Sequence, residues 1–398
     1  MNPNATPSVG KDPTPEDQTV VARRFGLGKR KAKKAGQRVL VASQWELIRW
    51  KFSRHKLAVA GLAVLGILYL GALFCEPLSP MDPRQTNASR RLAPPTRIRF
   101  RDESGLRITR PFVYGLTQVR DPLTLRFSYV DDETVQYRIR FFVRGAEYRL
   151  WGLFRSDLRL FGVEDGGDFF LMGTDTLGRD VFSRILYGSR ISLSIGLVGI
   201  AISFVLGVLI GGASGYFGGT IDIVIQRVIE FLRGIPTLPL WMGLSVALPP
   251  HWPMLRIYFG IVVILSLIGW TGLARVVRGK FMSLREEDFV MAARVHGAGE
   301  LKVIVKHMLP SFYSHIIASL TLSVPNMILG ETALSFIGLG LQSPAISWGV
   351  LLQQAQAIRV LANSPWLLAP GFFIIATILA FNFVGDGLRD AADPYATV

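Results

Sequence analysis

The sequence predicts an all-α membrane protein that crosses the bilayer several times and carries a small β-containing insert between its first two spans. Half of the 398 residues are hydrophobic and only 18% are charged. With a mean hydropathy of +0.35, this composition is too apolar for an ordinary soluble domain. The apolar residues are also gathered into six separate regions that are long enough to cross a membrane.

The first 56 residues are expected to form a basic tail in the cytoplasm. The run RRFGLGKRKAKKAGQR holds eight lysines and arginines, and Arg49, Lys51, Arg54 and Lys56 directly precede the first apolar region. Basic residues accumulate on the cytoplasmic side of membrane spans, and they also attract anionic lipid headgroups. No aromatic interleaving or recognised nucleic-acid module accompanies the run, so no nucleic-acid partner is expected.

The order of the apolar regions predicts a topology with both termini in the cytoplasm. The first span covers residues 57–75, and a polar insert follows at 76–172. Five further spans are expected at about Ile191–Tyr216, Ile221–Leu248, Ile257–Val277, Ser311–Phe336 and Trp366–Val384. Six crossings then place Arg278–Pro310 and the tail at 391–398 in the cytoplasm. Seven basic residues against four acidic ones between Arg275 and Lys306 agree with that side.

Two features of these spans predict local structure. Pro236 and Pro239 should kink the third span. The glycines of GGASG, Gly211–Gly215, allow another helix to approach closely, either within this chain or in a dimer.

The insert shows strand-like alternation of apolar and arginine residues. The clearest runs are TRIRFRD (Thr96–Asp102) and YRIRFFVRG (Tyr137–Gly145). Strands with one apolar face need something to cover that face. The insert is therefore expected to be a folded external module, which either roofs a transport pathway and meets a partner or serves as a structural lid.

The segment at 283–310 is charged and alanine-rich, although it lies between apolar spans. Ser283 and Glu286 have the spacing of a capping box, which predicts a helix from there to about His296. Gly297 is a plausible left-handed stop, and a second short helix should lead to Pro310. The first helix can be gripped by a partner protein, or it can rest on lipid headgroups.

This segment resembles the EAA signature of ABC importer permeases: Glu-Ala-Ala, three residues, Gly, nine residues, Ile-x-Leu-Pro. The expected ATPase-coupling residues are Ala292, Ala293, Gly297, Leu309 and Pro310, which match the pattern, together with the adjoining Arg294. Met291 and His307 replace the glutamate and the isoleucine, so a carboxylate contact at Met291 is not expected.

Other motifs extend the resemblance. GTDTLGRDVFSRILYGSRISL (Gly173–Leu193), ILGETALSFIGLGL (Ile328–Leu341) and FNFVGDGLRDAADP (Phe381–Pro394) are similar to signatures of the C-type permease of oligopeptide and dipeptide importers. The insert and the run FLRGIPTLPLWM resemble most closely the Yej-type branch, which is linked to peptides and to peptide antibiotics such as microcin C.

The resemblance implies a six-span type I ABC importer permease with its core at 173–390, in the bacterial inner membrane. The insert would be periplasmic. Such a permease pairs with a second, paralogous permease, docks two ATPase domains and receives peptide from a periplasmic binding protein. Closure of the ATPases around ATP moves the coupling helices and swings the spans from inward-open to outward-open.

The motifs that the sequence lacks favour a transport subunit over an enzyme. It contains neither the phosphate-binding pattern GxxxxGK[ST] nor an HExxH pair, and Cys75 is its one cysteine. No metal or cofactor is expected, and ATP hydrolysis should reside in partner subunits. An importer of the same family for another solute, such as nickel or a muropeptide, stays open. A self-contained channel or secondary transporter is disfavoured by the docking segment and by the scarcity of charge in the spans.

Three charged residues are candidates for a pathway or gate. Glu331 lies near the outer end of its span, where it can make a structural bond or contact a peptide amine. Asp175 and Arg179 lie just before the second span. Thr174 or Asp175 can cap that helix, or the pair can belong to an outer gate.

Overall fold

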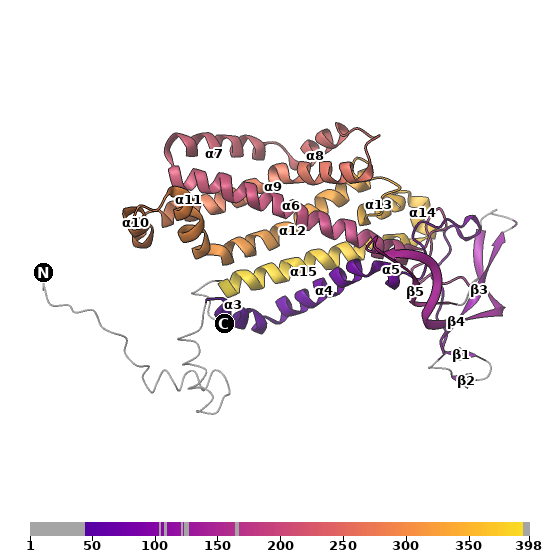
Figure 1. Cartoon of the computed structure of the whole chain (residues 1–398). Coiled ribbons are helices and arrows are strands. Elements are labelled where there is room, and N and C mark those ends of the chain that lie inside the picture. The colour runs from indigo at the N-terminus through magenta and orange to yellow at the C-terminus, as the bar shows by residue number, and fades with distance from the viewer. Residues whose placement is uncertain are drawn as a thin grey trace, which may run out of the picture.

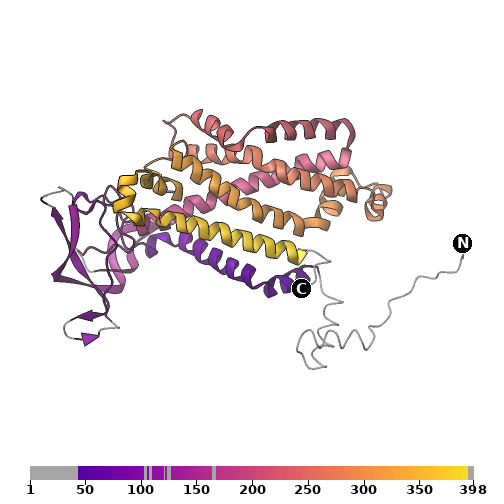
Figure 2. The same ribbon diagram turned by 180° about the vertical axis from the view of Figure 1, so that it is seen from behind.

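The computed structural model describes residues 44–102, 105–106, 110–120, 122, 127–163 and 167–392. These residues form a bundle of long helices with a small antiparallel sheet at one end (Figures 1 and 2). Most of the expected N-terminal tail, residues 1–43, lies outside the described residues, as does most of the expected C-terminal tail, residues 393–398.

Five helices of the described residues are long and apolar enough to cross a membrane. They are α4 (Lys56–Leu73), α6 (Val181–Phe217), α9 (Met254–Leu284), α12 (Tyr313–Ile337) and α15 (Ala369–Ala392). Each coincides with one of the apolar regions of the sequence. A short helix, α3 (Gln44–Arg54), precedes α4, and α15 packs between α4 and α12.

The remaining predicted span, Ile221–Leu248, consists of two helices. α7 (Gly219–Gly234) and α8 (Thr237–Val246) are separated at Ile235 and Pro236, where the proline ring disfavours a helical conformation for the residue before it. The two helices follow one another along α9 at one edge of the bundle (Figure 1). The predicted proline kink is therefore a complete break, and neither helix alone has the length of a membrane span.

Glycines bring α6 and α9 into close contact. A Cβ atom on Gly215 would lie 2.6 Å from the carbonyl oxygen of Arg278, and one on Gly211 would collide with the backbone of Ala274. Small residues allow helix backbones in a membrane to approach in this way. Of the two uses that the sequence left open for GGASG, packing within the chain is the one observed.

The insert contains two antiparallel pairings. β3 (Phe112–Arg120), β4 (Phe127–Leu150) and β5 (Phe154–Val163) form a sheet in that order, and β1 (Arg101–Asp102) pairs with β2 (Gly105–Leu106). The predicted strand Tyr137–Gly145 lies inside β4. The predicted strand Thr96–Asp102 is largely irregular, with an isolated bridge between Arg99 and Phe112.

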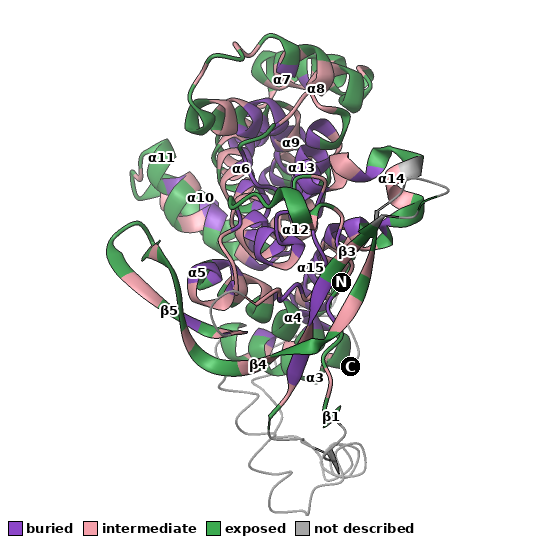
Figure 3. Cartoon of the chain, turned by 90° about the vertical axis from the view of Figure 1, so that its right-hand side faces the viewer, coloured by how far each residue is buried: buried purple, intermediate pink, exposed green. Residues whose placement is uncertain are grey.

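The connections between helices lie at the two ends of the bundle. The sheet lies at the same end as α5 (Cys75–Leu78), α13 (Trp348–Gln353) and α14 (Ile358–Asn363). At the other end lie α10 (Asp288–Val295), α11 (Glu300–Lys302), a π-helical turn at Val303–Met308 and a 3₁₀ turn at Leu309–Phe312. Viewed from the sheet end, buried residues gather inside the bundle, while much of the sheet is exposed (Figure 3).

A larger side chain at Gly211 should weaken the α6–α9 contact. We expect Gly211→Val to lower the thermal unfolding midpoint of the purified protein, because overpacking a tight contact costs about 1–3 kcal/mol. Gly66→Val in α4 is the matched control, since among the described residues nothing lies within 4 Å of a Cβ atom there. Equal midpoints for the two variants would contradict the close contact.

Candidate functional site

The first candidate site is α10 and the turn that follows it. The predicted capping box is wrong: α9 continues through Leu284, so Ser283 lies inside that helix, and α10 begins after Glu287. Gly297 has a φ of +75°, which agrees with the predicted left-handed stop. Among the described residues nothing lies within 4 Å of a Cβ atom at Gly297. Glycine is therefore favoured there by the backbone angle and not by lack of space.

One side of α10 is packed firmly onto the bundle. Val290 is fully buried in a cluster with Phe281 of α9 and Phe312, which precedes α12. The guanidinium of Arg294 lies 4.8 Å from the centre of the Tyr216 ring, at the end of α6, in cation–π geometry. α10 therefore contacts the ends of α6 and α9 and the start of α12.

The structure separates the two alanines of the EAA-like motif. Ala292 is exposed, whereas Ala293 is half-buried and packs against the Val290 cluster. Arg294, Gly297 and Pro310 are exposed, and Leu309 is buried. Three of the residues predicted to take part in coupling therefore lie on the exposed surface of the α10 turn: Ala292, Arg294 and Gly297. Ala293 and Leu309 instead pack against the bundle.

Exposed apolar side chains surround the α10 turn. Met291 is 54% exposed, Val295 86% and Leu301 77%. Large apolar side chains that are clustered and exposed mark a contact surface for a protein or for lipid.

A charged pair that the sequence did not predict joins α7 to α9 near this site. The guanidinium of Arg278 donates two hydrogen bonds of 2.5 Å to the carboxylate of Asp222, and the Ser214 hydroxyl donates a third. Asp222 lies in the first turn of α7, as expected for an acid near a helix N-terminus. Its partner lies 56 residues away in sequence, so helical spacing could not identify it. Arg227 and Glu230, three residues apart on α7, form a second ion pair at 2.9 Å.

Glu331 is fully buried among hydroxyl groups. Its Oε1 accepts hydrogen bonds from Ser335 (2.8 Å) and Ser347 (2.7 Å), and its Oε2 accepts a longer one from Ser192 (3.5 Å). Each serine also accepts a backbone N–H, from Leu341, Val350 and Trp348 respectively. Of the two roles that the sequence left open for Glu331, these contacts agree with the structural bond, and no arginine of the insert is bonded to it in the described structure. Glu331 instead joins α6 and α12 to the start of α13.

Asp175 and Arg179 form a buried pair beside the start of α6. Arg179 Nε donates to Asp175 Oδ2 at 2.7 Å, and Arg184 Nη1 lies 3.5 Å from the same oxygen. The predicted helix cap at Thr174 or Asp175 is wrong, because the Asp180 carboxylate accepts from the Ser183 amide and caps α6. Thr174 accepts from the Ala93 amide instead, and so links the insert to the core.

Two protein families match separate parts of the chain. The family described as the binding-protein-dependent transport system inner membrane component matches residues 203–397. The N-terminal TM domain of oligopeptide transport permease C matches residues 43–95. Neither covers residues 96–202, which include the sheet.

Relatives identify the chain further. It is 44% identical over 223 residues to the dipeptide transport system permease protein DppC of Bacillus subtilis, covering 56% of this chain and 68% of the relative. It is 42% identical over 231 residues to the oligopeptide transport system permease protein OppC of Haemophilus influenzae, covering 58% of this chain and 71% of the relative. A solved structure of the MetNI methionine ABC transporter overlaps 53% of this chain and 97% of its own, at 18% identity and a TM-score of 0.41.

The chain belongs to the family of binding-protein-dependent transport system inner membrane components. It is a multi-pass permease subunit of an ABC transporter of the bacterial inner membrane. Permeases of this family work with ATPase subunits, which hydrolyse the ATP, and with a substrate-binding partner.

Removal of the Glu331 carboxylate should destabilise the protein. Glu331→Ala leaves the buried hydroxyls of Ser335 and Ser347 without their acceptor, which costs about 1–3 kcal/mol for each unsatisfied group. We expect a lower thermal unfolding midpoint for Glu331→Ala and a smaller loss for Glu331→Gln, which retains one acceptor oxygen. If Glu331→Gln kept the wild-type midpoint and raised the KM for transport, a substrate contact would replace the structural assignment.

Proposed function

We propose that this chain is the transmembrane permease subunit of an ATP-driven importer that carries peptides across the inner membrane. The relatives of the chain supply the substrate class, since those at 38–44% identity are dipeptide and oligopeptide permeases. The proposal rests on one structural observation, the packing of the α10 turn. The turn is exposed on one side, and on the other it packs against side chains of α6, α9 and α12.

In this proposal α10 is the coupling helix. Ala292 presents little bulk to a partner, and Gly297 turns the chain sharply after the helix. The exposed apolar side chains beside them would be covered by an ATPase domain. Because Val290 is buried and Arg294 stacks on Tyr216, movement of the bound ATPase would be transmitted to α6, α9 and α12.

The proposed complex holds a second, paralogous permease, two ATPase domains and a periplasmic binding protein. The exposed apolar side of α7 and α8, including Ile223, Phe231 and Val246, is available for packing against the second permease. The binding protein would meet the opposite end of the bundle, where the sheet lies.

We assign the α10 end to the cytoplasm and the sheet end to the periplasm, so that both chain termini are cytoplasmic. The excess of basic residues between Arg275 and Lys306 supports this orientation. Because the sheet and α10 lie at opposite ends of the bundle, a cytoplasmic α10 puts the sheet in the periplasm (Figure 1).

Asp175, Arg179 and Glu331 are proposed to act at the periplasmic end by holding the connections around α6 and α13 in place. The buried carboxylate of Asp175 accepts a hydrogen bond from the Arg179 guanidinium, and the buried carboxylate of Glu331 accepts one from Ser347. This geometry favours an indirect role, in which the three residues affect an outer gate by holding the connections around α6 and α13. It does not favour direct contact with peptide.

The coupling assignment predicts different outcomes for the same substitution at two exposed alanines. Ala292→Arg should weaken co-purification of the ATPase subunits, or uncouple ATP hydrolysis from import, because it adds bulk and charge where the ATPase would close. Ala88→Arg is the matched control, since Ala88 is exposed at the sheet end. Normal assembly and peptide-stimulated hydrolysis in both variants would exclude Ala292 from the docking surface. Ala293→Arg is less informative, because Ala293 packs inward.

The orientation predicts opposite labelling of two introduced cysteines in a Cys75→Ser background. Thr134 and Glu300 are both exposed, and they lie at opposite ends of the bundle. An impermeant thiol reagent added to intact spheroplasts should label Thr134→Cys, and Glu300→Cys only after permeabilisation. Labelling of Glu300→Cys in intact spheroplasts would contradict this orientation and indicate the opposite one.

A further inference from the structure

The turn of the β4–β5 hairpin lies at the depth where α4 leaves the membrane. α4 has 18 residues and ends at Leu73, so it is about 27 Å long at 1.5 Å per residue. That length is close to the thickness of the hydrocarbon core. The indole N–H of Trp151, in the hairpin turn, donates a hydrogen bond of 2.8 Å to the Leu73 carbonyl. The turn therefore lies at the membrane–water boundary, which tryptophan favours.

A buried acid fixes the turn at this place. Glu76 accepts two hydrogen bonds of 2.8 Å from Arg190 of α6, and the Trp151 amide donates to the same carboxylate at 3.3 Å. Burial alone would raise the pKa of Glu76, but the hydrogen bonds and positive charge of Arg190, together with backbone hydrogen bonds, lower it. The Trp151 ring also packs 5.8 Å from that of Phe74. The hairpin is thus anchored to the ends of both α4 and α6.

The anchored turn exposes apolar side chains. Leu153 is 76% exposed and Phe154 is 62% exposed. Side chains two residues apart on a strand share a face, so Leu158 and Leu160 continue the face of Phe154 along β5, and both are exposed. In water such a face would be unfavourable, whereas at this depth the lipid can cover it.

Two arginines lie directly behind the apolar tip. Arg149 and Arg155 are opposite one another in the β4–β5 pairing, and both are exposed. Like charges directly opposite in an antiparallel pair are destabilising. A phosphate group can relieve the repulsion, because arginine binds phosphate with paired, charge-assisted hydrogen bonds. At the boundary of a bilayer, the nearest phosphates are those of the lipid headgroups.

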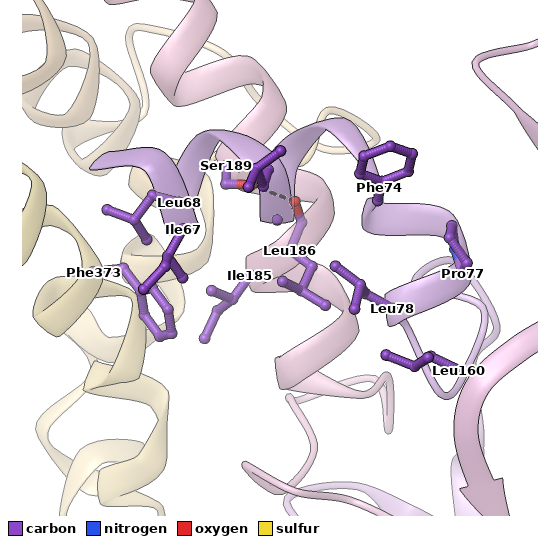
Figure 4. Close-up of a pocket in the computed structure, with 12 residues that line it drawn as sticks. Ile67, Leu68, Phe74, Pro77, Leu78, Leu160, Ile185, Leu186, Ser189 and Phe373 are labelled. Carbon is purple, nitrogen blue, oxygen red and sulfur yellow. Dashed lines mark hydrogen bonds between the residues drawn. The ribbon is translucent and has the colours of Figure 1, made fainter. Parts of the chain in front are cut away.

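An apolar hollow of about 590 Å³ adjoins the same face (Figure 4). It extends from Ile67 and Phe373 at one end to Leu160 of β5 at the other. Its lining includes the hydroxyl-bearing Ser189, but that hydroxyl already donates to the Leu186 carbonyl at 2.6 Å. The hollow thus suits an acyl chain and offers little to a polar ligand.

From these observations we infer that the tip of the β4–β5 hairpin, residues 149–155, is a membrane anchor that inserts its apolar side chains into the lipid leaflet at the sheet end of the bundle. Trp151, Leu153 and Phe154 lie among the upper acyl chains, and Arg149 and Arg155 bind phospholipid phosphates. The anchor holds one edge of the sheet against the bilayer, so that the insert keeps a fixed height above the bundle. This role does not depend on the nature of the transported substrate.

The anchor is tested by measuring the surroundings of a nitroxide label at Phe154→Cys. The assembled transporter is prepared in a Cys75→Ser background and reconstituted into phosphatidylethanolamine–phosphatidylglycerol vesicles. Collision rates of the label are then measured with oxygen, which concentrates in lipid, and with a water-soluble nickel chelate. Thr134→Cys, exposed on the sheet far from the tip, is the control in water. Leu153→Cys is the second test site if Phe154→Cys does not assemble.

We expect the ratio of oxygen to nickel collision rates to be several-fold higher at Phe154→Cys than at Thr134→Cys. Replacement of both Arg149 and Arg155 by glutamine should reduce that ratio, because the tip loses its phosphate contacts. A ratio equal to that of the control would put the tip in water. Low collision rates with both reagents would show that a partner protein covers it. Either of these results would overturn the anchor.

Discussion

The hydrocarbon core of a bilayer supplies no hydrogen-bond partner for a backbone amide or carbonyl, and this constraint organises the whole chain. Every segment that crosses the bundle is helical, so its backbone groups are satisfied locally. The strands and the short helices α5, α10, α11, α13 and α14 lie at the two ends (Figure 1). The break between α7 and α8 is the exception, and it falls at Pro236, which has no amide hydrogen to satisfy.

The same constraint governs the polar groups that the bundle retains. Glu331 is surrounded by serine hydroxyls that each accept a backbone N–H in turn. Asp222 and Arg278 neutralise one another through paired hydrogen bonds. Breaking the buried set around Glu331 is costly, because the remaining groups are left without a partner, whereas the Asp222–Arg278 pair is partly exposed. These clusters therefore fix which helices lie side by side, in places where apolar packing alone would allow sliding.

α6 extends from the sheet end of the bundle to the α10 end (Figure 1). It has 37 residues and spans about 55 Å at 1.5 Å per residue. At one end Tyr216 lies beneath Arg294 of α10, and near the other Arg190 holds the Glu76 carboxylate beside the hairpin turn. In the proposed mechanism, a movement of α10 that shifts or rotates α6 would therefore also move Arg190, which holds Glu76 beside the insert. The glycine contacts with α9 keep this helix close to its neighbour along the way.

The sequence alone determined the features that depend on local chemistry. Apolar runs of sufficient length located the membrane helices, Pro236 marked the break, and the left-handed turn at Gly297 followed from the glycine that ends α10. The ordered motifs also identified the family, because spacing between residues is preserved in the linear chain. Boundaries were less reliable: α9 runs on through Ser283 to Leu284, just beyond Phe281, which is buried against Val290 and Phe312.

Only the tertiary structure decided which distant residues meet. The pairs Asp222–Arg278, Glu331–Ser347 and Glu76–Arg190 join separate helices, and no helical or strand period relates their positions. The two alanines of the proposed coupling segment are adjacent in sequence, yet Ala292 faces outward and Ala293 packs inward. A helix turns by about 100° per residue, so which alanine reaches a partner depends on how α10 is rotated against the bundle. That rotation is set by the burial of Val290 among side chains from distant parts of the chain.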